Sequence, residues 1–344
     1  MATEDDGKIR ITSDDLERVT ISRAVPSAGA ASPDYGRVSA AAEPEQTKAS
    51  VFLKGWVYLG IAGFTGALLA WAICEPRFVD GGGRNTWANA LLFPLMLALM
   101  CVGFGSAEGI VERTPRKAAM RGLASLGLGL VLGFLFFAIA GLIFTIGLSI
   151  LAQIGPVDPR HPGFWLVRGI AWMGFGVAGG LVYGIVGQSG KKCLYGIAGG
   201  VLGAGLGGML FDPIAMLAHG GAASRAVGMV LFGSATGIAM GLVESALKDR
   251  WIYVSGGPLA GKHFILYKPV TTIGSDQSCD IYLFKDPTIL PRHAAIELNG
   301  LRATLRAAGP VLVKGRPLRD AVLLSGDSIQ IGRYTFQYKD RQRA

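Results

Sequence analysis

The chain has 344 residues, of which 51% are apolar, 17% are charged and 51 are glycine. This glycine content is about twice that of an ordinary soluble protein, and the mean hydropathy is +0.42. Such a composition excludes an ordinary soluble enzyme and favours a membrane protein with soluble parts. The net charge of +9 is uneven, because residues 1–50 carry 6 Lys and Arg against 9 Asp and Glu, whereas residues 250–344 carry 14 against 7.

Residues 1–50 are predicted to form a disordered cytoplasmic segment. They are rich in Ala, Ser, Pro and acidic residues, and their one periodic apolar patch, Leu16–Ile21, is too short to build a core.

Six apolar segments follow, and each reaches at least the length of about 20 residues that crosses a bilayer as a helix. They cover about 54–74, 87–110, 119–152, 164–187, 193–217 and 223–247. Ten Lys and Arg lie near the span ends on one side and five on the other, so the positive-inside rule places both termini in the cytoplasm. We therefore predict a six-helix transmembrane domain over residues 51–247, in a cell membrane and specifically a bacterial inner membrane, with the lipid bilayer as a partner.

The second, fourth and sixth spans share a pattern that indicates three copies of one helical hairpin. The three related stretches are Gly103–Gly109, Gly174–Gly180 and Leu231–Gly237. Each stretch contains glycines at four-residue spacing, which lets helix backbones approach closely in lipid. The sequence therefore predicts tight, glycine-mediated packing of the helices.

A transport pathway is the alternative function for the helices, in a small transporter or channel regulated by the C-terminal domain. Such a pathway needs ionisable groups inside the bilayer. The acidic residues Glu108, Asp212 and Glu244 lie toward span ends, where a charge costs little. This placement favours a packing role.

Catalytic and ligand-binding motifs are not recognisable in the sequence. We find no Walker loop, nucleophile elbow or CxxC pair, and the four histidines and four cysteines are not spaced as metal ligands. We therefore predict that the protein is not an enzyme, and we expect no cofactor, metal or nucleic acid to bind.

Beyond Arg250 the pattern changes to short β-type runs separated by turn residues, which predicts a cytoplasmic antiparallel sandwich over residues 250–344. The runs are 251–254, 263–267, 270–273, 281–283, 294–298, 303–306, 311–313, 328–331 and 334–338.

This sandwich resembles a forkhead-associated (FHA) domain over about residues 251–340. Five stretches carry the resemblance: Thr272–Ser275, Cys279–Ile281, Asp286–Ala294, Val313–Gly315 and Leu324–Gly332. The resemblance implies a reader of phosphothreonine peptides, in which loops at one end of the sandwich hold the phosphate and the peptide backbone. Arg, hydroxyl and backbone N–H donors suit this task, because a phosphate carries close to two negative charges.

The polar contact positions of the family are all substituted in this chain. Ser275, Leu290 and Lys314 stand where the family pattern has Arg, Ser and Asn. The candidate binding residues are therefore Ser275, Ser278, Leu290, Arg292, Lys314 and Gly315. The resemblance assigns structural roles to Gly274, His293, Gly326 and Asp327, and His293 is expected to brace a loop rather than touch the ligand.

We therefore predict a multi-pass membrane protein that presents an FHA-like protein-binding domain, in a signalling or scaffold role. Phosphothreonine-dependent binding, phosphate-independent binding and an oligomerisation surface all remain open. Only Lys248–Arg250 separate the last span from the first strand, so the domain is expected to lie close to the membrane. The acidic N-terminal segment, which includes Thr3 and Thr12, is a candidate ligand in cis.

Overall fold

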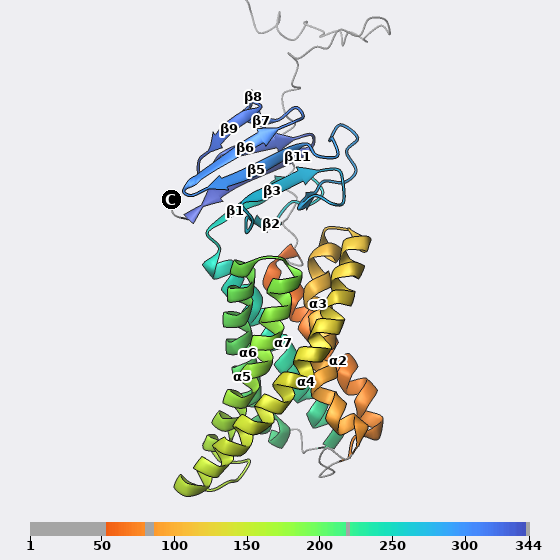
Figure 1. Ribbon diagram of the computed structural model, residues 1–344, viewed down its shortest axis with the longest axis vertical. Helices are drawn as coiled ribbons and strands as arrows, with labels where there is room; N and C mark the ends of the chain where they lie inside the picture. The colour runs from red at the N-terminus through yellow and green to blue at the C-terminus, as the bar shows by residue number, and fades with distance from the viewer. Residues whose placement is uncertain (1–52, 80–85, 218–220, 342–344) are drawn as a thin grey trace, which may run out of the picture. The chain divides into compact units, whose positions relative to one another are not determined.

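The computed structural model describes residues 53–79, 86–217 and 221–341, and consists of a helical bundle followed by a β-sandwich (Figure 1). The prediction of disorder over residues 1–50 lies outside the described residues. The order of elements confirms the predicted fold class, six long apolar helices and then an all-β domain.

The bundle contains six long helices and one short 3₁₀ helix within the described residues. They are α2 (Gly55–Cys74), η2 (Glu75–Arg77), α3 (Trp87–Val111), α4 (Pro115–Ile154), α5 (Pro162–Val186), α6 (Gly190–Leu217) and α7 (Gly221–Leu247). By length and composition, each of the six could cross a membrane. The helix α4 begins at Pro115, before the predicted 119, because proline suits the first position of a helix, where its missing N–H is not needed.

Glycine-mediated packing joins the three hairpins at equivalent positions. A methyl group added at Gly109 of α3 would lie 2.7 Å from the backbone nitrogen of Ala118 in α4. At the matching glycine of α5, Gly180, it would lie 2.3 Å from the backbone nitrogen of Ile197 in α6. The third equivalent, Gly237 of α7, meets α2 in the same way. Each second helix of a hairpin thus packs on the first helix of the next, as three copies of one hairpin predict.

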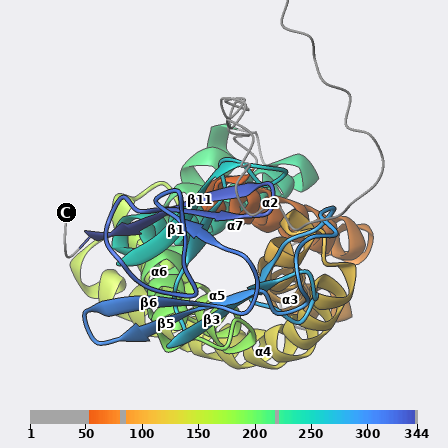
Figure 2. The same ribbon diagram turned by 90° about the horizontal axis from the view of Figure 1, so that it is seen from above.

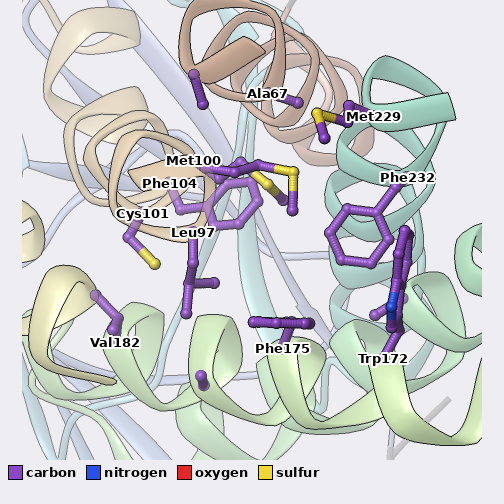
Figure 3. Close-up of a cluster of buried hydrophobic side chains, with 14 of the residues drawn as sticks. Ala67, Leu97, Met100, Cys101, Phe104, Trp172, Phe175, Val182, Met229 and Phe232 are labelled. Atoms are coloured by element: carbon purple, nitrogen blue, oxygen red, sulfur yellow. The ribbon is translucent and has the colours of Figure 1, made fainter. Parts of the chain in front are cut away.

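Aromatic and methionine side chains fill the centre of the bundle (Figure 3). The phenylalanine of each repeat, Phe104, Phe175 and Phe232, is at most 2% exposed. The rings of Phe175 and Phe232 lie 6.4 Å apart, edge to face, and Trp172 packs 5.0 Å from Phe232. The repeat pattern therefore places its aromatic residues in one shared core.

Ionisable residues of the helices form ion pairs with residues of other helices. These pairs could not be predicted from the positions of the residues in the sequence. Asp212 is buried near the end of α6 and lies 2.7 Å from the guanidinium of Arg168 on α5. The Arg225 side chain of α7 pairs with Glu75 of η2. These arginines occupy the same place in the second and third repeats, and each forms an ion pair with a residue near or just beyond the end of another helix.

The β-sandwich is built from two sheets, seen from above in Figure 2. One sheet has the order β2-β1-β11-β10-β7-β8 and the other β4-β3-β5-β6-β9. The strands are β1 (Arg250–Gly256), β2 (His263–Ile265), β3 (Val270–Gly274), β4 (Ile281–Tyr282), β5 (Ala294–Asn299), β6 (Arg302–Ala307), β7 (Leu312–Val313), β8 (Arg316–Pro317), β9 (Asp320–Leu323), β10 (Ser328–Ile331) and β11 (Tyr334–Asp340). Apolar residues of both sheets, with the buried rings of Tyr334 and Phe336, form the core.

Two details of the sandwich differ from the prediction. The prediction of a purely antiparallel sandwich was wrong at one pair, because β3 and β4 are parallel. The loop 275–280 carries the chain across the edge of the sheet, so that β4 runs in the same direction as β3. The strands β8 and β9 were not predicted, since one is only two residues long and contains a proline.

Candidate functional site

The end of β3 is fastened to the loop between β4 and β5. The backbone N–H of Ser275 donates to the carbonyl of Leu290 at 3.0 Å, and its hydroxyl donates to the carbonyl of Ile289 at 2.8 Å. A methyl group added at Gly274 would lie 2.0 Å from the carbonyl oxygen of Pro291, so only glycine fits there. The hydroxyl at the family's arginine position therefore stabilises the protein's own loop in this structure.

His293 holds the loop between β4 and β5 in place through hydrogen bonds. Its ring is buried, with Nδ1 accepting the backbone N–H of Leu290 at 3.1 Å. Because Nδ1 accepts, Nε2 carries the proton and donates to the carbonyl of Pro310 at 3.0 Å. Gly309 packs on the ring, and an added methyl group would lie 2.3 Å from its Cε1 atom. His293 thus contacts backbone groups of two loops, which is consistent with the structural role expected for it.

Lys314 and Gly315 form a two-residue turn between β7 and β8. Both have positive φ, +53° and +75°, the backbone of a type I′ hairpin turn. Asn-Gly is the pair that this turn prefers, so a lysine here holds a less favourable conformation. Its ammonium lies 3.0 Å from the carboxylate of Asp327 and stays half exposed.

Asp327, the partner of Lys314, also stabilises the turn before β10. Its side chain is buried and accepts the backbone N–H of Leu324 at 3.0 Å. The adjoining Gly326 has a φ of +98°, which favours glycine. Lys314 therefore neutralises a carboxylate that already orders the turn before β10.

Polar groups around the loops make further internal hydrogen bonds. The hydroxyl of Thr288 donates to Asp286 at 2.6 Å, and this bond, with backbone N–H groups of Arg333 and Thr288, lowers the pKa of the Asp286 carboxyl despite partial burial. The backbone N–H of Ser278 donates to Asp276 at 2.9 Å. Ser278 itself is exposed.

The candidate binding residues fall into two groups. Ser275, Ser278, Leu290 and Arg292 lie on the adjoining loops before β4 and β5, whereas Lys314 and Gly315 lie on the other sheet. Leu290 is 44% exposed, an apolar group where the family pattern has a hydroxyl. Arg292 is exposed on the same loop. The exposed cations of the site are thus Arg292 and Lys314.

Contacts from the helical bundle reach these loops, and the sequence analysis missed them. The ammonium of Lys117 in α4 donates to the carbonyl of Cys279 at 2.8 Å, in the loop that carries Ser275 and Ser278. The guanidinium of Arg113 lies 5.5 Å from the centre of the Phe284 ring. The basic turn between α3 and α4 therefore borders the candidate site. No signal in a single sequence pairs residues 162 positions apart.

Over residues 53–79, 86–217 and 221–341, no cluster of three or more His, Cys, Asp and Glu side chains could hold a metal ion.

Comparison with known proteins identifies the domain. Residues 271–332 match the family model of the FHA domain. Over 86 residues the chain is 36% identical to the glycogen accumulation regulator GarA of Mycolicibacterium smegmatis, covering 24% of this chain and 54% of the relative. It is also 36% identical over 86 residues to the oxoglutarate dehydrogenase inhibitor of Corynebacterium efficiens, covering 24% and 60%. The chain thus spans little more than half the length of these relatives.

Solved structures of FHA domains match about a quarter of the chain. The FHA domain of the CT664 protein from Chlamydia trachomatis is 26% identical, with a TM-score of 0.25, and the match covers 27% of this chain and 97% of that one. A second match is the FhaA FHA domain complexed with the intracellular domain of Rv3910, at 22% identity and a TM-score of 0.24, covering 26% and 99%.

Residues 271–332 are therefore an FHA domain, which confirms the resemblance seen in the sequence. FHA domains bind phosphothreonine-containing proteins, so a binding or regulatory role is indicated for this part of the chain.

Proposed function

We propose that this chain is a multi-pass protein of a cell membrane, specifically a bacterial inner membrane, that presents its FHA domain in the cytoplasm to bind a phosphothreonine-containing protein. The observation that carries the proposal is that the residues that position the loops of an FHA domain are present in this chain. Gly274 and His293 hold the loops before β4 and β5 in place, while Arg292 stays exposed on the same loop. In this proposal Arg292 supplies a charge for the phosphate in place of the family's arginine.

Binding to a phosphopeptide is tested by fluorescence anisotropy with the full-length protein in detergent, because Lys117 ties the loops to the helices. The probes are a degenerate phosphothreonine peptide library and its unphosphorylated twin. We expect the phosphorylated library to bind more tightly, and Arg292→Ala to weaken it at least tenfold. Arg302→Ala, an exposed arginine on β6, is the matched control. Equal binding of both libraries would contradict the role of the phosphate and leave a phosphate-independent docking domain.

The proposed membrane location rests on the surface of the bundle. Large apolar side chains are exposed along the helices, such as Leu123 at 72%. In the most apolar 18-residue stretch of α4, only 17% of the residues are buried. An exposed apolar surface of this extent is unfavourable in water and suits lipid. Resistance of the protein to alkaline extraction from bacterial membranes, with protease access to the C-terminus from the cytoplasmic side alone, tests this placement.

A scaffold is favoured over a transporter by the interior of the bundle. Phe104, Phe175 and Phe232 lie there in one cluster with methionines and Trp172 (Figure 3). Glu108 is engaged in ion pairs with Arg121 and Lys192. We expect Glu108→Gln to leave solute flux in reconstituted vesicles unchanged, whereas a conduit lined by this residue would lose flux.

The N-terminal segment remains a proposed ligand of the FHA domain in cis. Its residues 1–50 carry 9 acidic side chains and lie outside the described residues, whereas the domain is basic. Opposite charge and a short tether favour such an association. Deletion of residues 1–45 is expected to raise hydrogen exchange on the loops around Arg292, and unchanged exchange would contradict this proposal.

A further inference from the structure

A cavity of about 370 Å³ lies between helix ends of the bundle and the sandwich. The helix residues come from the start of α2, the end of α3, the starts of α4 and α6 and the end of α7, and the sandwich adds residues 262–265, 267–268, 271 and 280–281. Within this lining, seven side chains are Lys or Arg and four are Asp or Glu, so the formal net charge is +3.

Some of the cations are neutralised by carboxylates. Glu108 accepts from Lys192 at 2.5 Å and from Arg121 at 3.1 Å, so that one carboxylate serves two cations. Glu112 pairs with Lys262 at 2.9 Å, and both side chains are buried. These pairs leave an excess of positive charge on this wall of the cavity.

The other two carboxylates do not remove the excess. Asp280 pairs with Lys268 at 2.8 Å. Glu244 accepts hydrogen bonds from the hydroxyl groups of Tyr183 and Tyr267, which are neutral donors. Of the seven cations, four are therefore matched with carboxylates of the lining.

Three lysines of the lining have no carboxylate partner among the described residues. Lys117 donates to the carbonyl of Cys279, and Lys248 contacts Nδ1 of His263 at 3.3 Å. Lys54, the residue before α2, is exposed. Burial lowers the pKa of Lys248, although Glu244 opposes this effect. Lys117 and Lys248 are half-buried, and a cation that partly leaves water without a counter-charge is unfavourable, so an anion in the cavity would stabilise these two lysines.

We propose that this cavity binds a phosphate monoester dianion, with Lys54, Lys117 and Lys248 as its charged contacts. The volume falls in the range of small-molecule sites. The two negative charges of the ligand would offset two of the three positive charges of these lysines, and ammonium groups are common phosphate ligands. The group can come from a soluble phosphate monoester or from the headgroup of an anionic lipid, since the proposed membrane location puts the cavity at the depth of the headgroups. Arg292 does not line this cavity, and of the three lysines only Lys117 also contacts the loop before β4, through the carbonyl of Cys279.

The test uses the full-length protein in two forms. In detergent, the thermal unfolding midpoint is measured against glycerol 3-phosphate, with sulfate at equal ionic strength as the reference anion. In phosphatidylcholine nanodiscs, it is measured with and without 10 mol% dioleoyl phosphatidic acid. A shift in both forms assigns a site open to soluble ligands, and a shift in the nanodiscs alone assigns a lipid headgroup; either result supports the proposal.

Variants connect the shift to the cavity. Lys54→Gln, Lys117→Gln and Lys248→Gln are each expected to raise the concentration for the half-maximal shift at least fivefold. Lys54→Gln is the variant least prone to misfold, because its side chain is exposed. Arg116→Gln is the matched control, an exposed cation next to Lys117 that does not line the cavity.

The proposal is overturned if neither phosphate probe shifts the wild-type protein more than its reference does. It is equally overturned if Arg116→Gln weakens the response as much as Lys54→Gln does. Phosphopeptide binding by the Lys54→Gln variant, measured in parallel, separates the two sites. If only Arg292→Ala loses phosphopeptide binding, that result bears on the peptide site alone. If only Lys54→Gln loses the shift of the thermal midpoint, that result bears on the cavity alone.

Discussion

His293 joins two loops of the FHA domain through both of its ring nitrogens. In His293→Ala, the half-buried N–H of Leu290 and carbonyl of Pro310 lose these partners and the buried ring leaves a cavity, and a buried group left unsatisfied costs about 1–3 kcal/mol. We expect the free energy of unfolding of the domain to fall by about 3 kcal/mol, measured by denaturant unfolding. The neighbouring Arg292→Ala is the control, because an exposed side chain typically changes stability by less than about 0.5 kcal/mol. Equal effects of both variants would contradict a structural role for His293.

His263 supplies a pH dependence at the sandwich face that lines the cavity. Burial, and then the nearby charges of Lys248 and Lys54, lower the pKa of His263 from 6.5 to about 4. Between these values the unfolded chain binds a proton that the folded chain does not, so the stability contributed here falls as the pH falls from 6.5 to 4. We expect the thermal midpoint of His263→Gln to decline less over this range than that of the wild type. Parallel declines would show that His263 does not contribute.

The helices depend on glycine at the joints between hairpins. In Gly176→Ala the new methyl group would lie 2.1 Å from the carbonyl oxygen of Gly200, which forces α5 and α6 apart. Overpacking of this kind costs about 1–3 kcal/mol, and we expect a lower thermal midpoint in detergent. Gly127→Ala in α4 is the control, because nothing lies within 4 Å of its added methyl group. There the higher helix propensity of alanine is expected to add about 0.5–1 kcal/mol.

The elements were predictable to the extent that local patterns determine them. Long apolar runs and the repeated glycines around Phe104, Phe175 and Phe232 predicted the helices and the surfaces that they bury. Strands β8 and β9 escaped prediction because short edge strands have too few residues to show an alternation. The parallel pairing of β3 and β4 also escaped, since it depends on the path of a loop rather than on either strand.

The candidate site was predictable only in part. The FHA motifs identified Gly274, His293 and the three substituted positions, because their order along the chain is itself the signal. That the Ser275 hydroxyl donates to Ile289 and that Lys314 pairs with Asp327 follows from three-dimensional packing. The junction with the helices was not predictable, since the ion pair of Glu112 and Lys262 joins residues 150 positions apart without any motif.

At the scale of the whole molecule, buried polar contacts join the bundle to the sandwich. Lys262 and Glu112 are 5% and 7% exposed and lie 2.9 Å apart, while the Tyr267 hydroxyl donates to Glu244. Only Lys248 and Asp249 lie between α7 and β1, so the linker between the two parts is short. A change at the helix ends is therefore expected to reach the loops of the FHA domain.

Breaking the buried pair tests this coupling. Lys262→Met leaves the carboxylate of Glu112 buried without a partner, which typically costs about 3–5 kcal/mol. Separation of the sandwich from the helices would expose Glu112 to water and relieve most of this cost, whereas unfolding of the sandwich would also expose its core. We therefore expect hydrogen exchange to rise over residues 262–268 and 112–117, with β10 and β11 still protected.

Two further variants separate coupling from general damage. Lys191→Met removes an ion pair with Asp249 at the same end of the bundle, but both side chains are exposed, so little change in exchange is expected. Adding Glu112→Leu to Lys262→Met removes the unpaired charge, and because a buried pair replaced by apolar groups is often neutral, protection should return in part. If Lys262→Met exchanges like the wild type, or if Lys191→Met opens the junction equally, the buried pair does not hold the sandwich against the helices. If the double variant regains protection, the unpaired Glu112 carboxylate is what drives the two parts of the molecule apart.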